Sequence, residues 1–252
     1  EADIEPCEIE TSHEVLAPET QTLPLVFASP HSGRHYPPDF VAASRLDRLS
    51  LRRSEDGFVD EIFACAPRMG APLLRANFPR AYVDANREPF ELDPRMFVDP
   101  LPAYANTRSP RVAAGLGTIA RVVANGADIY RDKLAFSEAL RRIRNYYWPY
   151  HAALRELLDD TKTRFGGAIL VDCHSMPSIG GTTVRYHASP PWTSIDSYIR
   201  PSGRSHRYDW PLSSALQVER TGEFRERNRA GFEFGGCVDV AAHAGVGRHR
   251  QS

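Results

Sequence analysis

Two histidines stand directly after apolar runs that are typical of buried strands. His31 follows the run 23–28 within Ser-Pro-His-Ser-Gly, and His174 follows the run 167–172 within Asp-Cys-His-Ser-Met-Pro. In an open α/β sheet the ligand site lies at the carboxyl ends of the strands. Two imidazoles brought to that edge by separate strands can begin a metal site, which one or two carboxylates would complete. The pattern favours a metal-dependent hydrolase, and the alternative is that both histidines are ordinary core or surface residues.

The carboxylate partner is less sharply defined by the spacing. A glutamate three residues after His31 would give a compact HxxE motif, but Arg34 occupies that position. The next carboxylates along the chain are Asp39, Asp47, Glu55 and Asp56. The last two are best placed because we expect them to open a helix, where a carboxylate is held at a fixed position. Their alternative role is to interact with the dipole or cap of that helix.

A third group of polar residues follows the expected strand 81–84. Asn86 and Arg87 come just past it, and an arginine there can bind a substrate carboxylate through two parallel hydrogen bonds. Arg80, in the preceding turn, could add a donor or stabilise an oxyanion. The alternative for this group is a surface ion pair between Asp84 and Arg87.

Other catalytic chemistries have little support. Ser175 cannot form a serine–histidine relay merely by standing next to His174, and the chain has no GxSxG motif. Cys173 lies in an apolar strand, where an inert core thiol is expected. His151 lies in an aromatic helical stretch, which favours a packing role. GxGxxG and GxxxxGK[ST] nucleotide motifs are absent.

The elements that must position these residues alternate between strands and helices. Short strands are expected at 23–28, 72–76, 81–84 and 167–172, the last buried on both faces. One amphipathic helix is expected to begin at Ser54. A second, with Ser137 as a candidate cap, is expected to be kinked by Pro149. The proline-rich segment 88–110 is expected to be a long loop over the site. This order predicts an α/β fold with a doubly wound, mixed sheet.

Composition and charge exclude several function classes. The 252 residues carry a net charge of -1, which does not support a nucleic-acid or anionic-membrane partner. No run approaches the roughly 18 apolar residues of a membrane span. The four cysteines are scattered without a CxxC pair, so a thiolate zinc site is not indicated. A cytoplasmic enzyme is therefore expected.

The character of the sequence changes after Gly181. Residues 182–252 contain ten arginines and no lysine, and they lack helical or strand periodicity. We therefore expect an α/β metal-dependent amidohydrolase domain over 1–181, followed by an atypical C-terminal segment over 182–252. That segment is either a long irregular subdomain or sequence translated in a shifted frame.

Five motifs, in order over roughly residues 23–180, together resemble the N-formylglutamate amidohydrolase family. They are Ser-Pro-His-Ser-Gly-Arg at 29–34, Arg-Ser-Glu-Asp at 53–56, Val-Asp-Ala-Asn-Arg at 83–87, Trp-Pro-Tyr-His at 148–151 and Asp-Cys-His-Ser-Met-Pro at 172–177. The resemblance implies a fold like that of zinc-dependent carboxypeptidases. It also implies hydrolysis of N-formyl-L-glutamate to formate and glutamate in histidine degradation.

The resemblance further implies roles for individual residues. His31, His174 and Asp56 would bind one Zn²⁺, with Glu55 as second choice to Asp56. Asn86 and Arg87 would hold the glutamate end of a small N-acyl amino acid, and Arg80 could face the tetrahedral oxyanion.

The family pattern continues to a strand that ends in a glutamate, the expected general base. Here only 215–220 resembles that strand, and it comes sooner after His174 than expected, so Glu219 is the candidate base. One alternative substrate is a different N-acyl amino acid. An alternative of another class is a catalytically silent or truncated homologue that binds metal or ligand without turnover. The oligomeric state is left open by the sequence.

Overall fold

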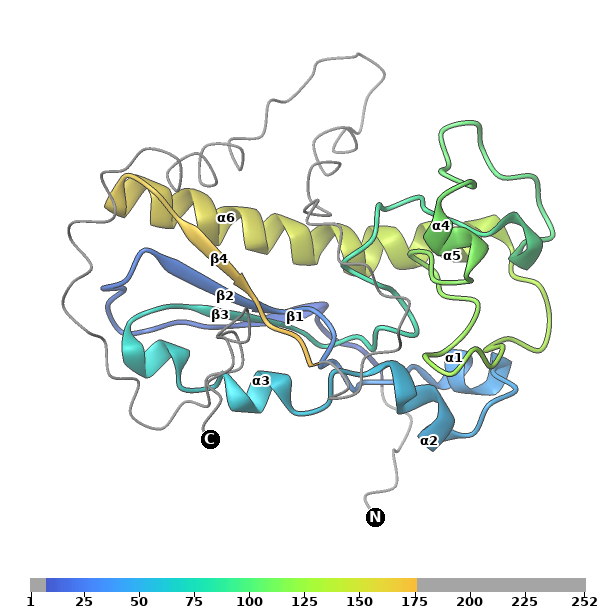
Figure 1. Ribbon diagram of the computed structural model, residues 1–252, viewed down its shortest axis with the longest axis horizontal. Helices are drawn as coiled ribbons and strands as arrows, with labels where there is room; N and C mark the ends of the chain where they lie inside the picture. The colour runs from blue at the N-terminus through green and yellow to red at the C-terminus, as the bar shows by residue number, and fades with distance from the viewer. Residues whose placement is uncertain (1–7, 176–252) are drawn as a thin grey trace, which may run out of the picture.

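The computed structural model describes residues 8–175, which contain a four-stranded mixed sheet (Figure 1). The strands lie in the order β1-β3-β2-β4. β1 is antiparallel to β3, whereas β2 runs parallel to both β3 and β4. Their bounds are His13–Leu16 for β1, Leu25–Ser29 for β2, Leu73–Ala76 for β3 and Ile169–Asp172 for β4. The predicted α/β class with a mixed sheet is confirmed.

Helices lie on both sides of this sheet. The long helix α6 packs against β2 and β3, and α3 lies on the opposite side of the strands (Figure 1). Among residues 8–175, no helix combines the length and the apolar character needed to cross a membrane. The α-helices are α1 Pro38–Ala43, α2 Arg48–Leu51, α3 Val59–Ile62, α4 Pro110–Ala113, α5 Phe136–Arg142 and α6 Trp148–Phe165. Short 3-10 turns occupy Arg52–Ser54, Ala66–Met69 and Pro94–Met96.

The parallel pairing of β2 with β4 explains how two distant histidines come together. Ala28 is paired with Asp172, so both strands end at the same level and at the same edge of the sheet. His31 stands three residues past Ala28, and His174 stands two residues past Asp172. The register therefore delivers both imidazoles to the carboxyl ends of neighbouring strands, as predicted.

An aromatic core supports the loops on that side. A guanidinium lies within it: the Arg142 Cζ atom is 4.1 Å from the ring centroid of Tyr82, and Arg142 is 2% exposed. Its charge is matched by Glu138, which accepts from Arg142 Nε at 2.7 Å. The contact between Arg142 and the Tyr82 ring joins α5 to the segment that leads into Asn86 and Arg87. The largest fully buried side chains of the core include Tyr36, Phe40, Phe78, Tyr82, Tyr147 and Tyr150.

The predicted strand at 81–84 is wrong. The backbone turns at Pro79, whose carbonyl accepts from the N–H groups of Tyr82 and Val83. Asp84 N–H then donates to the carbonyl of Thr118 instead of to a neighbouring strand. Buried apolar residues at 81–83 gave the segment a strand-like composition, but they fill the core from a turn.

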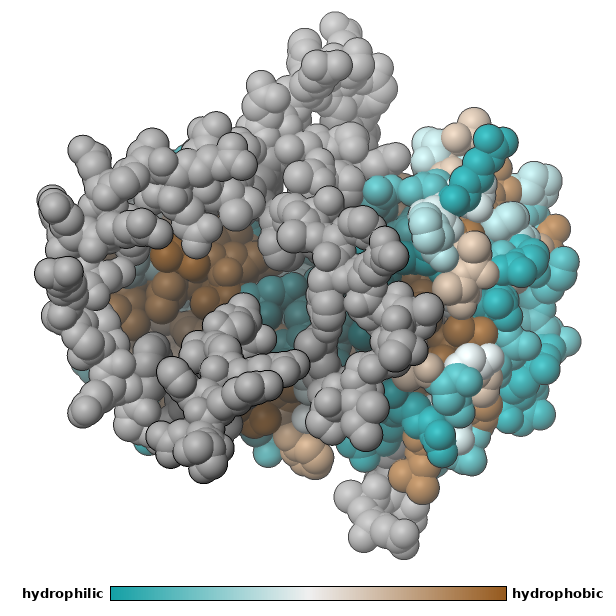
Figure 2. Space-filling model, in the orientation of Figure 1, coloured by the Kyte–Doolittle hydropathy of each residue, from teal (hydrophilic) through white to brown (hydrophobic). Residues whose placement is uncertain are grey.

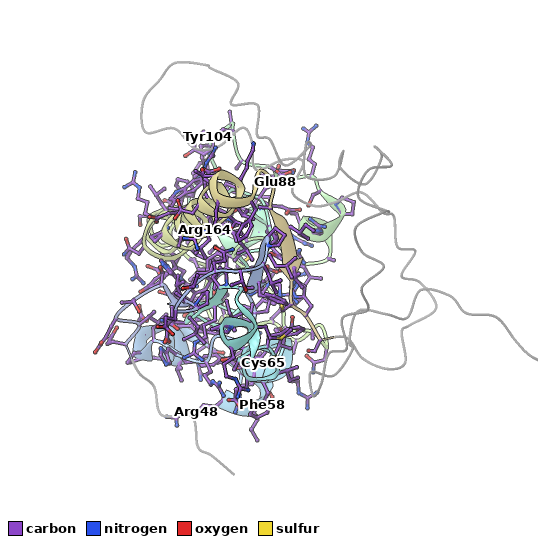
Figure 3. All side chains as sticks on the ribbon, turned by 90° about the vertical axis from the view of Figure 1, so that its left-hand side faces the viewer. Arg48, Phe58, Cys65, Glu88, Tyr104 and Arg164 are labelled. Carbon is purple, nitrogen blue, oxygen red and sulfur yellow. The ribbon has the colours of Figure 1, made fainter. Side chains whose placement is uncertain are left out.

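The first residue predicted for the next helix, Ser54, is also wrong. Glu55 is extended, with ψ of 142°, and the helix forms only at Val59–Ile62. Phe58 lies between Glu55 and this helix, and it has a left-handed φ of 64°, a conformation that interrupts helix propagation. Its side chain projects from the surface and is 58% exposed (Figure 3). Glu55 and Asp56 consequently belong to a loop rather than to a first helical turn.

The predicted long helix exists, and a π-helical turn precedes its proline. A π-helical turn at Ile143–Tyr147 joins α5 to α6, and Pro149 lies in the first turn of α6. A π turn changes the hydrogen-bond pattern at the point where proline removes a donor. Ser137 is not the cap, because the capping position is Ala135 and no side chain caps that end.

The last strand is less buried than predicted. Its four residues are exposed or partly exposed, with Ile169 at 44%. Among the described strands, β4 pairs only with β2, so it forms one edge of the sheet. Figure 2 shows apolar surface on this face over the sheet. A run of apolar residues indicated a central strand, whereas among the strands of residues 8–175 it lies at the edge.

Candidate metal centre

His31, Asp56 and His174 form one compact group of possible metal ligands. One donor atom from each residue lies within 4.8 Å of the others. The two imidazole ring centroids are 4.9 Å apart. His31 and Asp56 are buried, and His174 is half-buried. The structure thus brings together three residues that are far apart in the sequence.

Asp56 is held by His31 through its backbone and by His174 through its side chain. Its N–H donates to the carbonyl of His31 at 3.0 Å, and its Oδ2 accepts from His174 Nδ1 at 2.7 Å. Burial would raise the pKa of the Asp56 carboxyl, but the interactions with His174 and His31 together outweigh it and hold that pKa well below the usual range. Asp56 is therefore an anionic ligand candidate near neutral pH.

Glu55 points away from this group. Its Oε1 accepts from Tyr36 Oη at 2.6 Å, and its Oε2 accepts from Arg52 Nε at 2.9 Å. Both carboxylate oxygens are thereby committed to other elements. The geometry favours Asp56 over Glu55 as the carboxylate of the cluster.

His31 carries the observation that fits a metal ion. Its Nε2 is 2.8 Å from Asp84 Oδ1, and because an ionised carboxylate only accepts, that nitrogen holds the proton. In the neutral ring Nδ1 then presents a lone pair. Among the described residues this buried Nδ1 has no hydrogen-bond partner, and Asp56 Oδ2 lies 3.4 Å away. Two imidazoles and one carboxylate are the donor set of catalytic zinc sites, so the residues fit that metal.

Asp84 is a second-layer residue that the sequence did not reveal. It is 3% exposed and accepts from Arg80 Nε at 3.0 Å and from the N–H of Asn86 at 2.9 Å. Burial would raise its pKa, but the charge of Arg80 and the hydrogen bond from His31 hold the pKa well below its usual range. The suggested ion pair between Asp84 and Arg87 exists, but it does not lie on the surface, because the 3.5 Å contact is buried. A carboxylate that orients a metal-binding histidine in this way is common in metal sites.

Asn86 lies beside the cluster, and Arg87 lies against Asp84, which contacts His31. Asn86 Nδ2 donates to Asp172 Oδ2 at 3.0 Å and lies 2.9 Å from His174 Nε2. Arg87 donates from Nε to the carbonyl of Leu116 and from Nη1 to the carbonyl of Asn86. Burial lowers the pKa of the Arg87 guanidinium, an environment in which a bound anion would be favourable.

Arg80 is a second guanidinium, besides Arg87, that contacts Asp84. Its side chain is 27% exposed, and Nε is used by Asp84, so its terminal nitrogens remain for another acceptor. Burial lowers the pKa of Arg80, but Asp84 and, more weakly, Asp56 outweigh it and raise that pKa. The carboxylate of Asp56 therefore interacts electrostatically with the Arg80 guanidinium.

His174 is held by carboxylates on both ring nitrogens. Its Nδ1 faces Asp56, and its Nε2 lies 3.0 Å from Asp172 Oδ2. Burial would lower its pKa, but the hydrogen bonds with Asp172 and Asp56 raise the pKa of His174 to about 9. Without a bound ion, this ring is therefore protonated at neutral pH.

The remaining candidates take the structural roles expected of them. Burial raises the pKa of the Cys173 thiol to about 12, which makes it a poor nucleophile. His151 is buried against the carbonyl of Ala85 at 2.9 Å, and burial lowers its pKa to about 4. The candidate base Glu219 lies outside the described residues.

The fold and the site together define an α/β protein with a two-histidine, one-carboxylate cluster at the carboxyl ends of parallel strands. The family model for N-formylglutamate amidohydrolase matches residues 23–210. The chain belongs to the N-formylglutamate amidohydrolase family, and the resemblance seen in its motifs is confirmed.

Two relatives and one solved structure agree with this assignment. The chain is 29% identical over 167 residues to an N-formylglutamate deformylase of Pseudomonas aeruginosa, covering 66% of this chain and 56% of that protein. It is 28% identical over 158 residues to an N-formylglutamate deformylase of Pseudomonas putida, covering 62% and 53%. The crystal structure of N-formylglutamate amidohydrolase from Ralstonia eutropha JMP134 aligns with a TM-score of 0.62 and 40% identity, over 66% of this chain and 59% of that one. The chain spans about half the length of the curated relatives it matches.

Proposed function

We propose that this chain is a zinc-dependent amidohydrolase that cleaves the N-formyl amide of N-formyl-L-glutamate, or of a similar small N-acyl amino acid. The observation that carries the proposal is the buried cluster of His31, Asp56 and His174 with its unpartnered Nδ1. The names of the relatives support the substrate. The setting proposed with it is histidine degradation in the cytoplasm.

The three cluster residues would hold one Zn²⁺. When bound, zinc supplies a Lewis acid that polarises a carbonyl and lowers the pKa of water to about 7. The net reaction adds water across the amide: the formyl carbon gains the oxygen, the C–N bond breaks, and the nitrogen of glutamate takes a proton. Asp84 contributes by keeping the Nδ1 lone pair of His31 turned toward Asp56.

The neighbouring side chains would bind and orient the substrate. In this proposal Arg87 and Asn86 hold a carboxylate of the glutamate part. Arg80, through the nitrogens that Asp84 does not use, donates to the oxyanion that develops on the formyl oxygen. Glu219 is proposed as the general base that takes the proton from water and passes it to the leaving nitrogen.

The proposal is tested by formate release from N-formyl-L-glutamate by the purified full-length chain, with and without added zinc. Zinc-dependent release is expected, and it should be lost after chelation and return with zinc. Bound zinc without release of the free amino acid from any N-formyl or other N-acyl amino acid tested would reject it. That result would support the alternative, a homologue that binds metal without turnover.

A further inference from the structure

The backbone that carries Asn86 and Arg87 is held by side chains rather than by a strand or a helix. The three consecutive carbonyls at 85–87 each accept from a side chain. Among residues 8–175, none of the three accepts from a backbone N–H group outside the regular elements. The Asn86 carbonyl accepts from Arg87 itself, through Nη1 at 2.8 Å. The other two accept from helix residues that the proposed function does not use.

Tyr147 and His151 supply these two bonds. Tyr147 Oη donates to the carbonyl of Arg87 at 2.7 Å, and His151 Nε2 lies 2.9 Å from the carbonyl of Ala85. Because a carbonyl only accepts, Nε2 holds the ring proton of His151 and donates that hydrogen bond. The two bonds therefore hold the chain on either side of Asn86.

The helix presents both donors on one face. Tyr147 ends the π-helical turn, and His151 lies four residues further on in α6, so the two side chains are neighbours. Their ring centroids are 4.2 Å apart. Tyr147 is 1% exposed and His151 is 9% exposed, so water has little access to either bond. The pair is thus a closely packed support for the segment 85–87.

The position of this backbone decides how Arg87 can meet a ligand. Its Nε donates to the carbonyl of Leu116 and its Nη1 to that of Asn86, which leaves Nη2 for a ligand. The strength of a bond between a planar guanidinium and a carboxylate depends on the direction of that plane. A small rotation of the Arg87 backbone would therefore weaken carboxylate binding without removing a charge.

We propose that Tyr147 and His151 are positioning residues, which set the direction in which Asn86 and Arg87 face a substrate carboxylate. The inference rests on the proposed function, because it takes Asn86 and Arg87 as the residues that hold this carboxylate. It predicts that the Tyr147 hydroxyl acts on the ligand only through Arg87. A purely structural hydroxyl would instead change the free energy of unfolding and leave the affinity for ligand unchanged.

The test measures the affinity of the full-length chain for L-glutamate, the amino-acid product of the proposed reaction, by calorimetry. Tyr147→Phe removes one hydroxyl and should weaken binding by about 5- to 10-fold. Tyr150→Phe is the matched control. It makes the same change three residues further along α6, at a buried hydroxyl that has no hydrogen-bond partner among the described residues. This control should bind L-glutamate within about twofold of the wild type.

A double-mutant cycle with Arg87→Ala separates positioning from general destabilisation. In the Arg87→Ala background, Tyr147→Phe should weaken binding by less than about twofold, because no guanidinium remains to be oriented. His151→Leu should also weaken binding, and His151→Gln should recover most of the loss, because the glutamine N–H can replace Nε2 as the donor. A Gln variant that binds no better than the Leu variant would overturn the role of His151.

The outcomes separate the inference from the proposed function. No binding of L-glutamate by the wild type, an affinity of Tyr147→Phe within about twofold of the wild type, or an equal loss with and without Arg87 would overturn the inference. A loss that depends on Arg87, together with no formate release by the wild type, would reject the proposed function and leave the positioning role standing. Where turnover is present, Tyr147→Phe should raise KM for N-formyl-L-glutamate by about the same factor and keep kcat within about twofold. A lower kcat at unchanged KM would overturn the inference.

Discussion

Asp84 decides how His31 is presented to a metal ion. Its carboxylate accepts a hydrogen bond from the protonated Nε2 of His31 and is itself held by Arg80 and the backbone of Asn86. This arrangement fixes the tautomer and the ring orientation, so that the Nδ1 atom is the one left for a metal. A change at Asp84 should therefore act on metal affinity without removing a ligand.

Asp84→Asn is expected to weaken zinc binding by about 10- to 100-fold while one ion per chain still binds at saturation. The amide lacks the negative charge that stabilises the protonated Nε2. Competition with a chromophoric chelator measures the affinity. Asp39→Asn is the control, because the Asp39 side chain is 63% exposed and pairs only with Arg141 among the described cations. An affinity equal to that of the wild type in Asp84→Asn would remove Asp84 from this role.

Zinc affinity should rise with pH between about 7 and 9. The pKa of His174 is raised to about 9, so the ring carries a proton at neutral pH that a metal ion must displace. One displaced proton corresponds to about a tenfold gain in apparent affinity per pH unit up to that pKa, and to little change above it. Calorimetry in buffers of different ionisation enthalpy counts the protons released. A pH-independent affinity over this range would contradict the assignment of His174.

The sequence predicted most of the cluster but not its support. His31 and His174 stand after recognisable strands, and Asp56 and Glu55 were the best placed carboxylates. The choice between them depends on Tyr36 and Arg52, which donate hydrogen bonds to the Glu55 carboxylate. The sequence does not show these contacts, because they form only in the folded chain. Asp84 was missed because its role requires the turn at Pro79 to fold beneath His31, and that turn has the composition of a strand.

At the scale of elements, the loop after β2 depends on a close backbone approach. A Cβ atom at Gly33 would lie 2.1 Å from the carbonyl oxygen of Phe78, far inside contact distance. The loop that carries His31 therefore packs directly on the turn that follows β3. Glycine is required at this position for steric reasons.

Gly33→Ala is expected to lower the free energy of unfolding by about 1–3 kcal/mol and to reduce zinc occupancy, because the two backbones must separate. Urea unfolding with and without zinc measures both effects. Gly57→Ala is the matched control: it lies next to Asp56, and an added Cβ there meets no atom within 4 Å. If Gly33→Ala unfolds within about 0.5 kcal/mol of the wild type, the packing argument is wrong.

Elements with clear periodicity were predictable, and those set by tertiary contacts were not. The strands at 25–29, 73–76 and 169–172 and the long helix follow from apolar runs and spacing. β1 was missed, because it is a short segment with a partly exposed pattern. The π turn before Pro149 was not predicted, since sequence shows the missing donor but not how the backbone compensates for it.

At the scale of the whole molecule, the site lies within the α/β unit of residues 8–175. We propose that 1–181 folds as the metal-binding domain and that 182–252 is a separate segment. The family match extends to residue 210, past that boundary. The proposed division therefore leaves the ligands in one part and the candidate base Glu219 in the other.

Glu219→Gln should lower kcat for formate release by about 10²- to 10⁴-fold if Glu219 is the base, with zinc stoichiometry unchanged. The amide is nearly the same size but cannot accept a proton. Steady-state kinetics with elemental analysis of the same sample provide the measurement, and Glu223→Gln, four residues further on, is the control. Full turnover by Glu219→Gln would exclude Glu219 as the base.

The most direct test of the metal centre is the zinc content of the full-length chain after zinc loading and dialysis, measured by elemental analysis. The wild type and a His35→Ala control, which changes an exposed histidine of the same loop, should each hold one zinc per chain. His31→Ala and His174→Ala should each hold close to none. One tightly held zinc in either of these two variants would contradict the assignment of His31, Asp56 and His174 as the metal centre.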